Sequence, residues 1–123
     1  MIKEKIIKTE VIIENIIEGI QKKKGQEITI IDLAELTNAF CDKFIICHGD
    51  SNRQVTAIAD SVEEVCIENI HITPFHKEGY QNAKWILLDF GMTIVHIFQK
   101  ETRNFYQLED LWADGKFERI NDE

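Results

Sequence analysis

Isoleucines recur at helical spacing along the first twenty residues of the chain. Those at positions 2, 6, 13, 16, 17 and 20 keep this spacing, and glutamate and lysine fill much of the rest. This spacing follows the 3.6-residue period of a helix with one apolar face. Three lysines and Gly25 come next, which is typical of a helix C-terminus. The pattern therefore predicts a helix over residues 2–20.

Two short apolar runs follow and have the composition of strands. Glu27 to Leu33 is rich in β-branched residues, and Lys43 to Cys47 is a compact apolar run. The connection between them, residues 34–42, shows no clear period. Because this connection is short, the two strands are expected to pair antiparallel.

A second helix is predicted over residues 52–69. Ser51 and Gln54 have the spacing of a capping box, and apolar residues keep helical spacing after them. Around the single proline, the run from Ile70 to Phe75 is typical of a short extended segment. A strand that holds Pro74 has to lie at a sheet edge, because proline cannot donate to a ladder.

The last third of the chain predicts a hairpin and a helix. Trp85 to Phe90 and Thr93 to Gln99 have the pattern of strands that are buried on both faces, with Gly91 at the turn. After them, aromatic and leucine side chains recur at the spacing of one helix face, namely Phe105, Leu108 and Trp112. The residues after Trp112 have little pattern and are expected to be loosely held.

The predicted fold class is α/β, with a mixed five-stranded sheet flanked by helices. The element order is α, β, β, α, β, β, β, α, and the strand order does not follow from it. The third strand is expected to run parallel to the second through the helical crossover. A single domain is expected over residues 1–113, with an acidic tail over 114–123.

Composition and charge narrow the class of partner. The chain has 123 residues, 44% of them hydrophobic and 29% charged, and no apolar run long enough to cross a bilayer, so a cytoplasmic protein without membrane contact is expected. The formal net charge of -8 repels a phosphate backbone, which argues against direct nucleic-acid binding. It favours a basic protein as partner.

No arrangement of residues predicts catalysis, a metal ion or a cofactor. The loop around Gly49 joins a strand to a helix N-terminus but lacks the lysine and the spacing of a phosphate-binding loop. The aspartates near strand ends form no Asp-x-Asp pair, and the histidines lack ligand spacing. The three cysteines are odd in number and far apart, so they are expected to be buried side chains.

The aromatic residues therefore carry the functional prediction. Both tryptophans and three of the seven phenylalanines lie in the stretch from Trp85 to Trp112. Most aromatic residues at strand and helix spacing belong to a core. Trp85 is different, because it starts a strand directly after a polar loop, where a large ring is easily left at the surface.

Two long motifs resemble the signatures of the ribosomal silencing factor family, also called RsfS or Iojap-like. One is the run DKFIICHGDSNRQVTAIAD, and the other is WILLDFGMTIVHIFQKETRNFYQLEDLW. The resemblance covers about residues 5 to 113. It implies a nucleotidyltransferase-like α/β sheet without the catalytic carboxylates.

The resemblance also implies a function without chemistry. A family member binds the large ribosomal subunit through ribosomal protein L-fourteen and blocks association of the subunits, which represses translation when nutrients are scarce. The tryptophan before the fourth strand, here Trp85, is the implied contact. Weaker implied contacts are Leu87, Asp89, His96, Arg103 and Tyr106.

Two alternatives stay open at this stage. One is a nucleotide-binding or nucleotidyltransferase-like enzyme on the same sheet, and the other is a homodimer in the free state that uses the aromatic surface. The chain departs from the family pattern at Lys84, Met92 and His48, which leaves the charges of the interface open.

Overall fold

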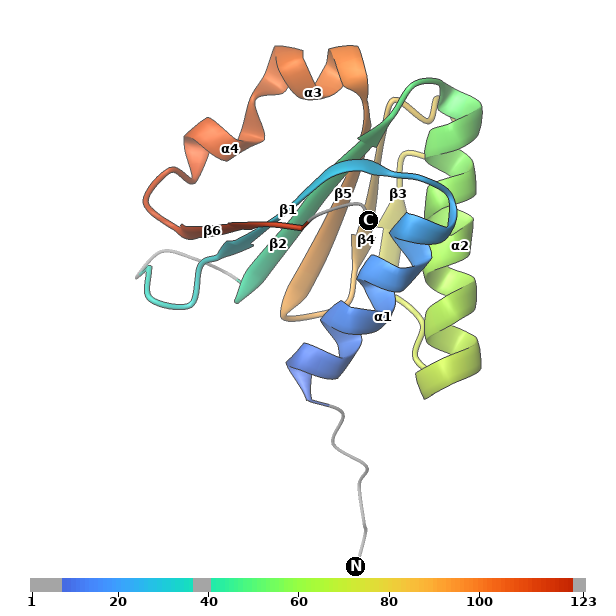
Figure 1. Cartoon of the computed structure of the whole chain (residues 1–123), viewed down its shortest axis with the longest axis horizontal. Coiled ribbons are helices and arrows are strands. Elements are labelled where there is room, and N and C mark those ends of the chain that lie inside the picture. The colour runs from blue at the N-terminus through green and yellow to red at the C-terminus, as the bar shows by residue number, and fades with distance from the viewer. Residues whose placement is uncertain (1–7, 37–40, 121–123) are drawn as a thin grey trace, which may run out of the picture.

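The computed structural model describes residues 8–36 and 41–120, which fold into one sheet with helices on both sides (Figure 1). The helices are α1 (Thr9–Lys22), α2 (Asn52–Ile70), α3 (Lys100–Tyr106) and α4 (Leu108–Leu111). The strands are β1 (Gln26–Asp32), β2 (Lys43–Gly49), β3 (His76–Glu78), β4 (Trp85–Asp89), β5 (Thr93–Gln99) and β6 (Lys116–Arg119). The predicted α/β class with a mixed sheet is confirmed. None of these helices is long and apolar enough to cross a membrane.

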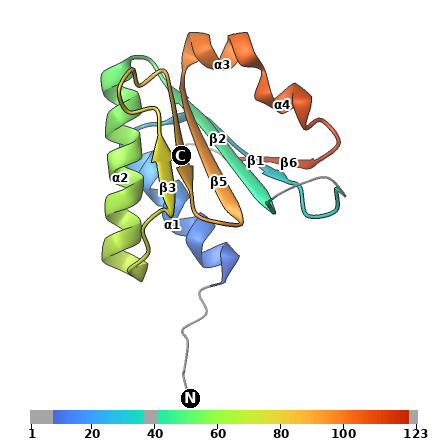
Figure 2. The same ribbon diagram turned by 180° about the vertical axis from the view of Figure 1, so that it is seen from behind.

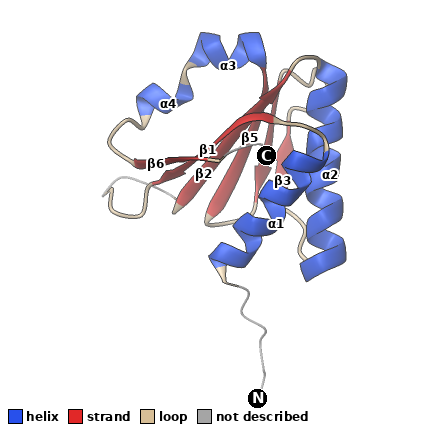
Figure 3. Ribbon diagram, viewed as in Figure 1, coloured by secondary structure: helices blue, strands red, loops and turns tan. Residues whose placement is uncertain are grey.

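The strand order is β3-β4-β5-β2-β1-β6 (Figure 3). Only β2 and β5 pair in parallel, and every other neighbouring pair is antiparallel. The antiparallel pairing of β1 with β2 is therefore confirmed. The expectation that the third strand runs parallel to β2 is confirmed, because β3 and β5 are both antiparallel to β4 and β5 is parallel to β2. However, β3 lies at the sheet edge, and the strand that pairs with β2 is β5.

Helices α1 and α2 cover one face of the sheet (Figures 1 and 2). Their close approach is set by Gly19, where an added Cβ would lie 2.6 Å from the Cα of Val62. At the same crossing the Ser61 hydroxyl donates to the Gly19 carbonyl at 2.8 Å. The apolar face predicted for the first helix packs here, with Ile16 and Ile20 fully buried. Residues 2–7 of that predicted helix lie outside the described residues.

The predicted cap of the second helix is confirmed. The Ser51 hydroxyl accepts from the Gln54 amide at 3.1 Å, and α2 begins at Asn52. The Gln54 side chain reaches back to the Asp50 amide rather than to Ser51, at 2.8 Å. The segment Ile70–Phe75 is not a strand. The edge strand β3 begins one residue later, at His76, beyond Pro74.

The prediction of five strands is wrong by one. The sixth strand, β6, comes from the segment after Trp112, where the pattern predicted no strand. All four of its side chains are exposed, so it carries no alternation of burial that the sequence could reveal. Its backbone pairs with β1 from Thr29 to Asp32. The expectation of a loosely held tail is therefore wrong for these residues.

The predicted last helix is broken in two. Gln107 adopts a left-handed conformation, with φ 49°, between α3 and α4. Leu108 and Trp112 pack against the second face of the sheet, as one helix face would require. Phe105 does not join them and is 79% exposed, because the break turns α3 away from the register of α4. We call α3 and α4 together, residues 100–111, the arm.

The hairpin of β4 and β5 is buried unequally. Every residue of β5 from Thr93 to Phe98 is buried, but β4 alternates between buried and half-buried side chains. The prediction that both strands are buried on both faces is thus wrong for β4. Helix α3 of the arm contacts β5 and β2, and the arm lies on the side of the sheet opposite α1 and α2 (Figure 2).

Candidate functional site

The open side of β4 presents a short row of side chains away from the helical core. Ile86 and Leu88 are fully buried under α1 and α2, so Trp85, Leu87 and Asp89 lie on the opposite face. Trp85 and Leu87 pack against the smaller apolar cluster there and stay half-buried. This confirms that the sheet leaves Trp85 partly accessible.

The arm extends this row into a larger aromatic surface. The Trp85 and Tyr106 ring centroids are 5.1 Å apart, and Phe105 lies 5.0 Å from Tyr106. Tyr106 is 52% exposed. We call Trp85, Leu87, Phe105 and Tyr106 together the aromatic rim. It combines two half-buried and two exposed apolar side chains, and accessible apolar side chains of this kind are typical of protein–protein contacts.

Trp85 is held from beneath by β5. Its indole ring packs on Phe98, with 4.8 Å between the ring centroids. Its Nε1 donates a hydrogen bond to Nδ1 of His96 at 3.1 Å. One edge of the indole is thus fixed by the sheet, and the remaining surface is free for a partner.

His96 lies inside the protein rather than on the rim. It is 4% exposed, with Phe44 edge-on at 4.6 Å between ring centroids. Burial lowers the pKa of His96 to about 4, so the ring is neutral at neutral pH. A partner that approaches the rim therefore meets Trp85 and not His96.

Arg103 is also buried and serves the fold as a clamp. Its Nε and Nη2 donate to one oxygen of Glu109 at 3.0 and 2.6 Å, within the arm. Its Nη1 donates to the Glu27 carbonyl at 2.9 Å and to Nδ1 of His48 at 3.0 Å, and Nη2 also reaches the Thr29 hydroxyl at 3.3 Å. The guanidinium thereby ties both helices of the arm to β1 and β2.

The clamp depends on an irregular stretch of β1. The β1–β2 register shifts between Gln26 and Thr29, and Glu27 has a φ of 50°. This bulge turns the Glu27 carbonyl out of the ladder with β2, where Arg103 takes it as an acceptor. Of the implied contact residues, Arg103 and His96 are therefore buried, and Trp85, Leu87, Asp89 and Tyr106 are accessible.

Asp89 lies at the far end of β4 from Trp85. Its carboxylate accepts from the Gly91 amide at 2.8 Å, which stabilises the hairpin turn. Gly91 has a φ of 96°, which favours glycine there. Met92 next to it is 50% exposed. Of the three departures, Lys84 and Met92 are accessible, and His48 is buried in the clamp.

Three features of this site were missed in the sequence. The pattern predicted Phe105 on one helix face with Leu108 and Trp112, and it gave no sign that Leu111 is exposed, which it is to 74%. The partners of Arg103 lie up to 76 positions away in sequence, so no local spacing could indicate them. The i, i+6 pair of Arg103 and Glu109 is not a helical spacing, and only the break at Gln107 brings the two together.

The loop around Gly49 is filled by the chain's own side chains. The Gln54 carbonyl oxygen accepts from the Asp50 amide, and its amide group donates to the carbonyls of Lys23 and Lys24 at 3.1 and 3.2 Å. An added Cβ on Gly49 would meet the Gln54 side chain at 3.0 Å. The polar groups of the loop are therefore used in hydrogen bonds that join the start of α2 to the end of α1, and the loop has no open space for a phosphate.

Asp32 and Asp89, two of the aspartates near strand ends, lie on strands that are not neighbours in the sheet. Asp32 is paired with Lys43 at 2.9 Å, and the Ala34 amide and Lys43 lower its pKa. Asp89 lies on the other side of β2 and β5. Within residues 8–36 and 41–120, no three histidine, cysteine, aspartate or glutamate side chains lie where they could share a metal ion. All three cysteines are buried, as predicted.

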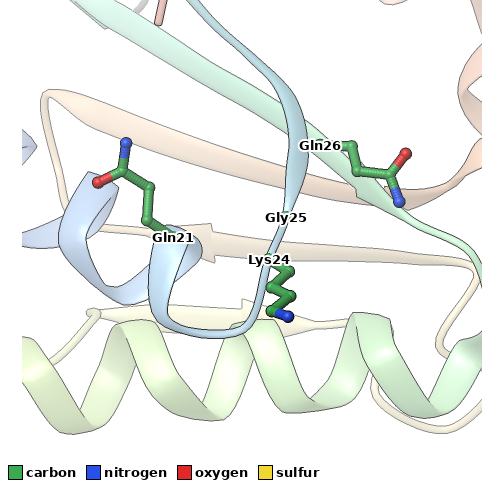
Figure 4. A pocket seen from close by; sticks show the side chains of 4 residues that line it. All are labelled: Gln21, Lys24, Gly25 and Gln26. Atoms are coloured by element: carbon green, nitrogen blue, oxygen red, sulfur yellow. The ribbon is translucent and has the colours of Figure 1, made fainter. Parts of the chain in front are cut away.

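A cavity of about 470 Å³ lies at the end of α1, on the helical side of the sheet. Gln21, Lys24, Gly25 and Gln26 line it (Figure 4). Their side chains point in different directions and do not converge on one centre (Figure 4). These four residues include no carboxylate, histidine or thiol, and Lys24 is the one ionisable side chain among them.

Lowering the pH from 6.5 toward 4 is expected to destabilise the fold through His48 and His96. Burial lowers both pKa values, and Arg103 also lowers that of His48, so the unfolded chain binds more protons in this window. The contribution of these rings to the free energy of unfolding is fully present above the ordinary histidine pKa. As the pH falls below that value, the free energy of unfolding decreases by up to ~1.4 kcal/mol per pH unit for each ring. Urea unfolding at a series of pH values measures the slope. His96→Phe should flatten it, and an equal slope in the variant would exclude His96 as a source.

Comparison with known proteins shows which family the chain matches. The family model described as "Ribosomal silencing factor during starvation" matches residues 7–123. The chain is 40% identical over 93 residues to the ribosomal silencing factor RsfS of Bacillus subtilis, covering 76% of this chain and 77% of the relative. It is 36% identical over 99 residues to RsfS of Halalkalibacterium halodurans, covering 80% and 83%.

A solved structure agrees with the fold. The chain is similar to a crystal structure of a Chromobacterium violaceum protein, with a TM-score of 0.81 and 33% identity. The match covers 87% of this chain and 88% of that one. The family match over residues 7–123 therefore includes all the described residues, and the structural match covers most of the chain.

Proposed function

The chain belongs to the ribosomal silencing factor family, and from this membership we propose that it represses translation by binding the large ribosomal subunit through ribosomal protein L-fourteen. Bound there, it blocks association of the ribosomal subunits when nutrients are scarce. Blocking needs only affinity and bulk. The proposal therefore requires a binding surface and no catalytic group, and it places the protein in the cytoplasm with the ribosomes.

The aromatic rim is the observation that carries this proposal. Trp85 and Tyr106 are rigid aromatic side chains, held in mutual contact and partly open to solvent. Such side chains dominate the energetics of protein interfaces, because they bury a large area at a small entropic cost. We assign direct contacts to Trp85, Leu87 and Tyr106.

The other implied residues have supporting or peripheral roles in this proposal. His96 and Arg103 act through the residues that they hold, since they are 4% and 6% exposed. Asp89 lies at the opposite end of β4 and would contact the edge of a partner. The net charge of -8 speeds the encounter with a basic ribosomal protein and disfavours direct contact with ribosomal RNA.

The same rim would serve self-association in the free state. A homodimer that buries Phe105, 79% exposed, and Tyr106 would shield these side chains from water until the ribosome competes for them. The two uses exclude each other. The dimer is therefore expected to dissociate when large subunits are added.

The function is tested by the joining of purified subunits. Large and small subunits are mixed, and light scattering follows the formation of assembled ribosomes. Excess protein added before mixing is expected to reduce the assembled fraction in proportion to the occupied large subunits. An unchanged fraction at full occupancy of the large subunit would contradict the proposed mode of repression.

A further inference from the structure

We propose that His96 is a positioning residue for Trp85, whose indole N–H it accepts at a buried nitrogen and whose orientation on the rim it thereby sets. The consequence for ribosome binding rests on the proposed function. The positioning itself is a property of the free chain. It differs from a contact role, because His96 would never touch the partner.

The surroundings of His96 hold its ring in one place. It lies on β5 directly opposite Leu87 of β4, and Trp85 is the next outward residue along β4. Phe98 stacks parallel to the imidazole at 6.3 Å and an interplanar angle of 14°, and Phe44 meets it edge-on. A ring that is fixed by packing offers its nitrogen in a fixed direction, as a positioning group requires.

The polarity of His96 has no use except at Trp85. Its Nε2 is buried without a hydrogen-bond partner among the described residues, and a buried unpaired donor destabilises the fold. A phenylalanine would fill this apolar site without that cost. Within residues 8–36 and 41–120, the one polar contact of the ring is the bond from Trp85 to Nδ1, at 3.1 Å.

The bond also requires the neutral ring. Nδ1 can accept from the indole only when the proton is on Nε2, which is the tautomer that leaves Nε2 as the unpaired donor. The lowered pKa of His96, caused by burial, keeps the ring in this neutral form at neutral pH. One neutral tautomer thus accounts both for the hydrogen bond at Nδ1 and for the unpaired donor at Nε2.

Without this bond, the indole of Trp85 would lose its directional restraint. Its ring contacts with Phe98, Tyr106 and His96, tilted by 33°, 48° and 46°, are not directional, so they do not by themselves fix where the indole N–H points. The hydrogen bond fixes that direction. A partner would then meet an indole that is already ordered, which reduces the entropy lost on binding.

Two substitutions separate the hydrogen bond from the packing. His96→Phe keeps a ring of similar size but removes the acceptor, and His96→Asn loses the ring but keeps an oxygen close to the position of Nδ1. The indole N–H of Trp85 is followed by nuclear magnetic resonance and hydrogen exchange in the free protein. Trp112→Phe assigns the two indole signals. Binding is measured by sedimentation with isolated large ribosomal subunits.

We expect His96→Phe to speed indole exchange at Trp85 and to weaken binding by about fivefold to tenfold, with the indole of Trp112 unchanged. In His96→Asn, the indole exchange rate of Trp85 and the binding affinity should both stay closer to those of the unsubstituted chain. The reverse order, with phenylalanine tolerated and asparagine damaging, would show that His96 only fills space and would overturn the proposal.

A second route removes the donor instead of the acceptor. Trp85→Phe leaves His96 in place. When it is combined with His96→Phe in a double variant, the losses of binding affinity caused by the two substitutions should not add. Fully additive losses would overturn the proposal. If the unsubstituted chain itself fails to bind large subunits, the proposed function fails, and the indole exchange rates still decide the positioning role.

Discussion

Replacing Arg103 with alanine is expected to lower the free energy of unfolding by about 3 kcal/mol. The guanidinium makes five hydrogen bonds, to Glu27, Thr29, His48 and Glu109, and it is 6% exposed. Its removal leaves the Glu109 carboxylate without its cation and the arm without its polar tie to β1. A loss of this size is a large share of the 5–15 kcal/mol by which domains are commonly stable.

Urea unfolding followed by circular dichroism measures this loss. Arg119→Ala is the matched control, because Arg119 also faces a glutamate, Glu27, but at 3.9 Å and with 61% of its side chain exposed. That variant should stay within ~0.5 kcal/mol of the unsubstituted chain. Arg103→Lys should lose most of the stability as well, because a lysine cannot reproduce the planar fork. Equal stability of Arg103→Ala and Arg119→Ala would show that the clamp does not hold the arm.

Replacing Trp85 with alanine is expected to weaken binding to the large ribosomal subunit by ~2 kcal/mol or more, which is about thirtyfold. Trp85 is half-buried in the rim, in ring contact with Tyr106 and Phe98. Its loss removes the largest side chain of the proposed interface and the ring on which Tyr106 rests. The fold should survive, because the main core lies on the other side of β4.

Sedimentation with isolated large subunits at a series of protein concentrations gives the change in affinity. Phe75→Ala is the matched control, since Phe75 is 83% exposed and lies beside Asp89, at the other end of β4. It should bind as the unsubstituted chain does. If Trp85→Ala binds unchanged, Trp85 lies outside the interface, and if both variants bind weakly, exposed aromatic area in general and not the rim is responsible.

Local signals in the sequence were enough to predict most of the fold. Ser51 and Gln54 marked the start of α2, and Gly91 marked the turn between β4 and β5, because each of these depends on residues close in sequence. The class of the fold followed from the order of elements. Trp85 at the start of a strand, directly after a polar loop, indicated the accessible aromatic side chain.

The remaining features depend on contacts between distant residues. Strand β6 is held by backbone pairing with β1, while its side chains are exposed and carry no pattern. An arginine in a helix is typical of a solvated surface, so the buried state of Arg103 could not be predicted from its neighbours. The break at Gln107 uses a left-handed residue that is not glycine, for which the sequence has no signal.

Binding to the large subunit is tested most directly by sedimenting the protein with isolated large subunits, isolated small subunits and assembled ribosomes side by side. The protein is expected to co-sediment with free large subunits, and not with small subunits or with assembled ribosomes, whose small subunit covers the surface it would occupy. Co-sedimentation with small subunits alone, or equally with assembled ribosomes, would contradict a factor that acts by keeping the two subunits apart.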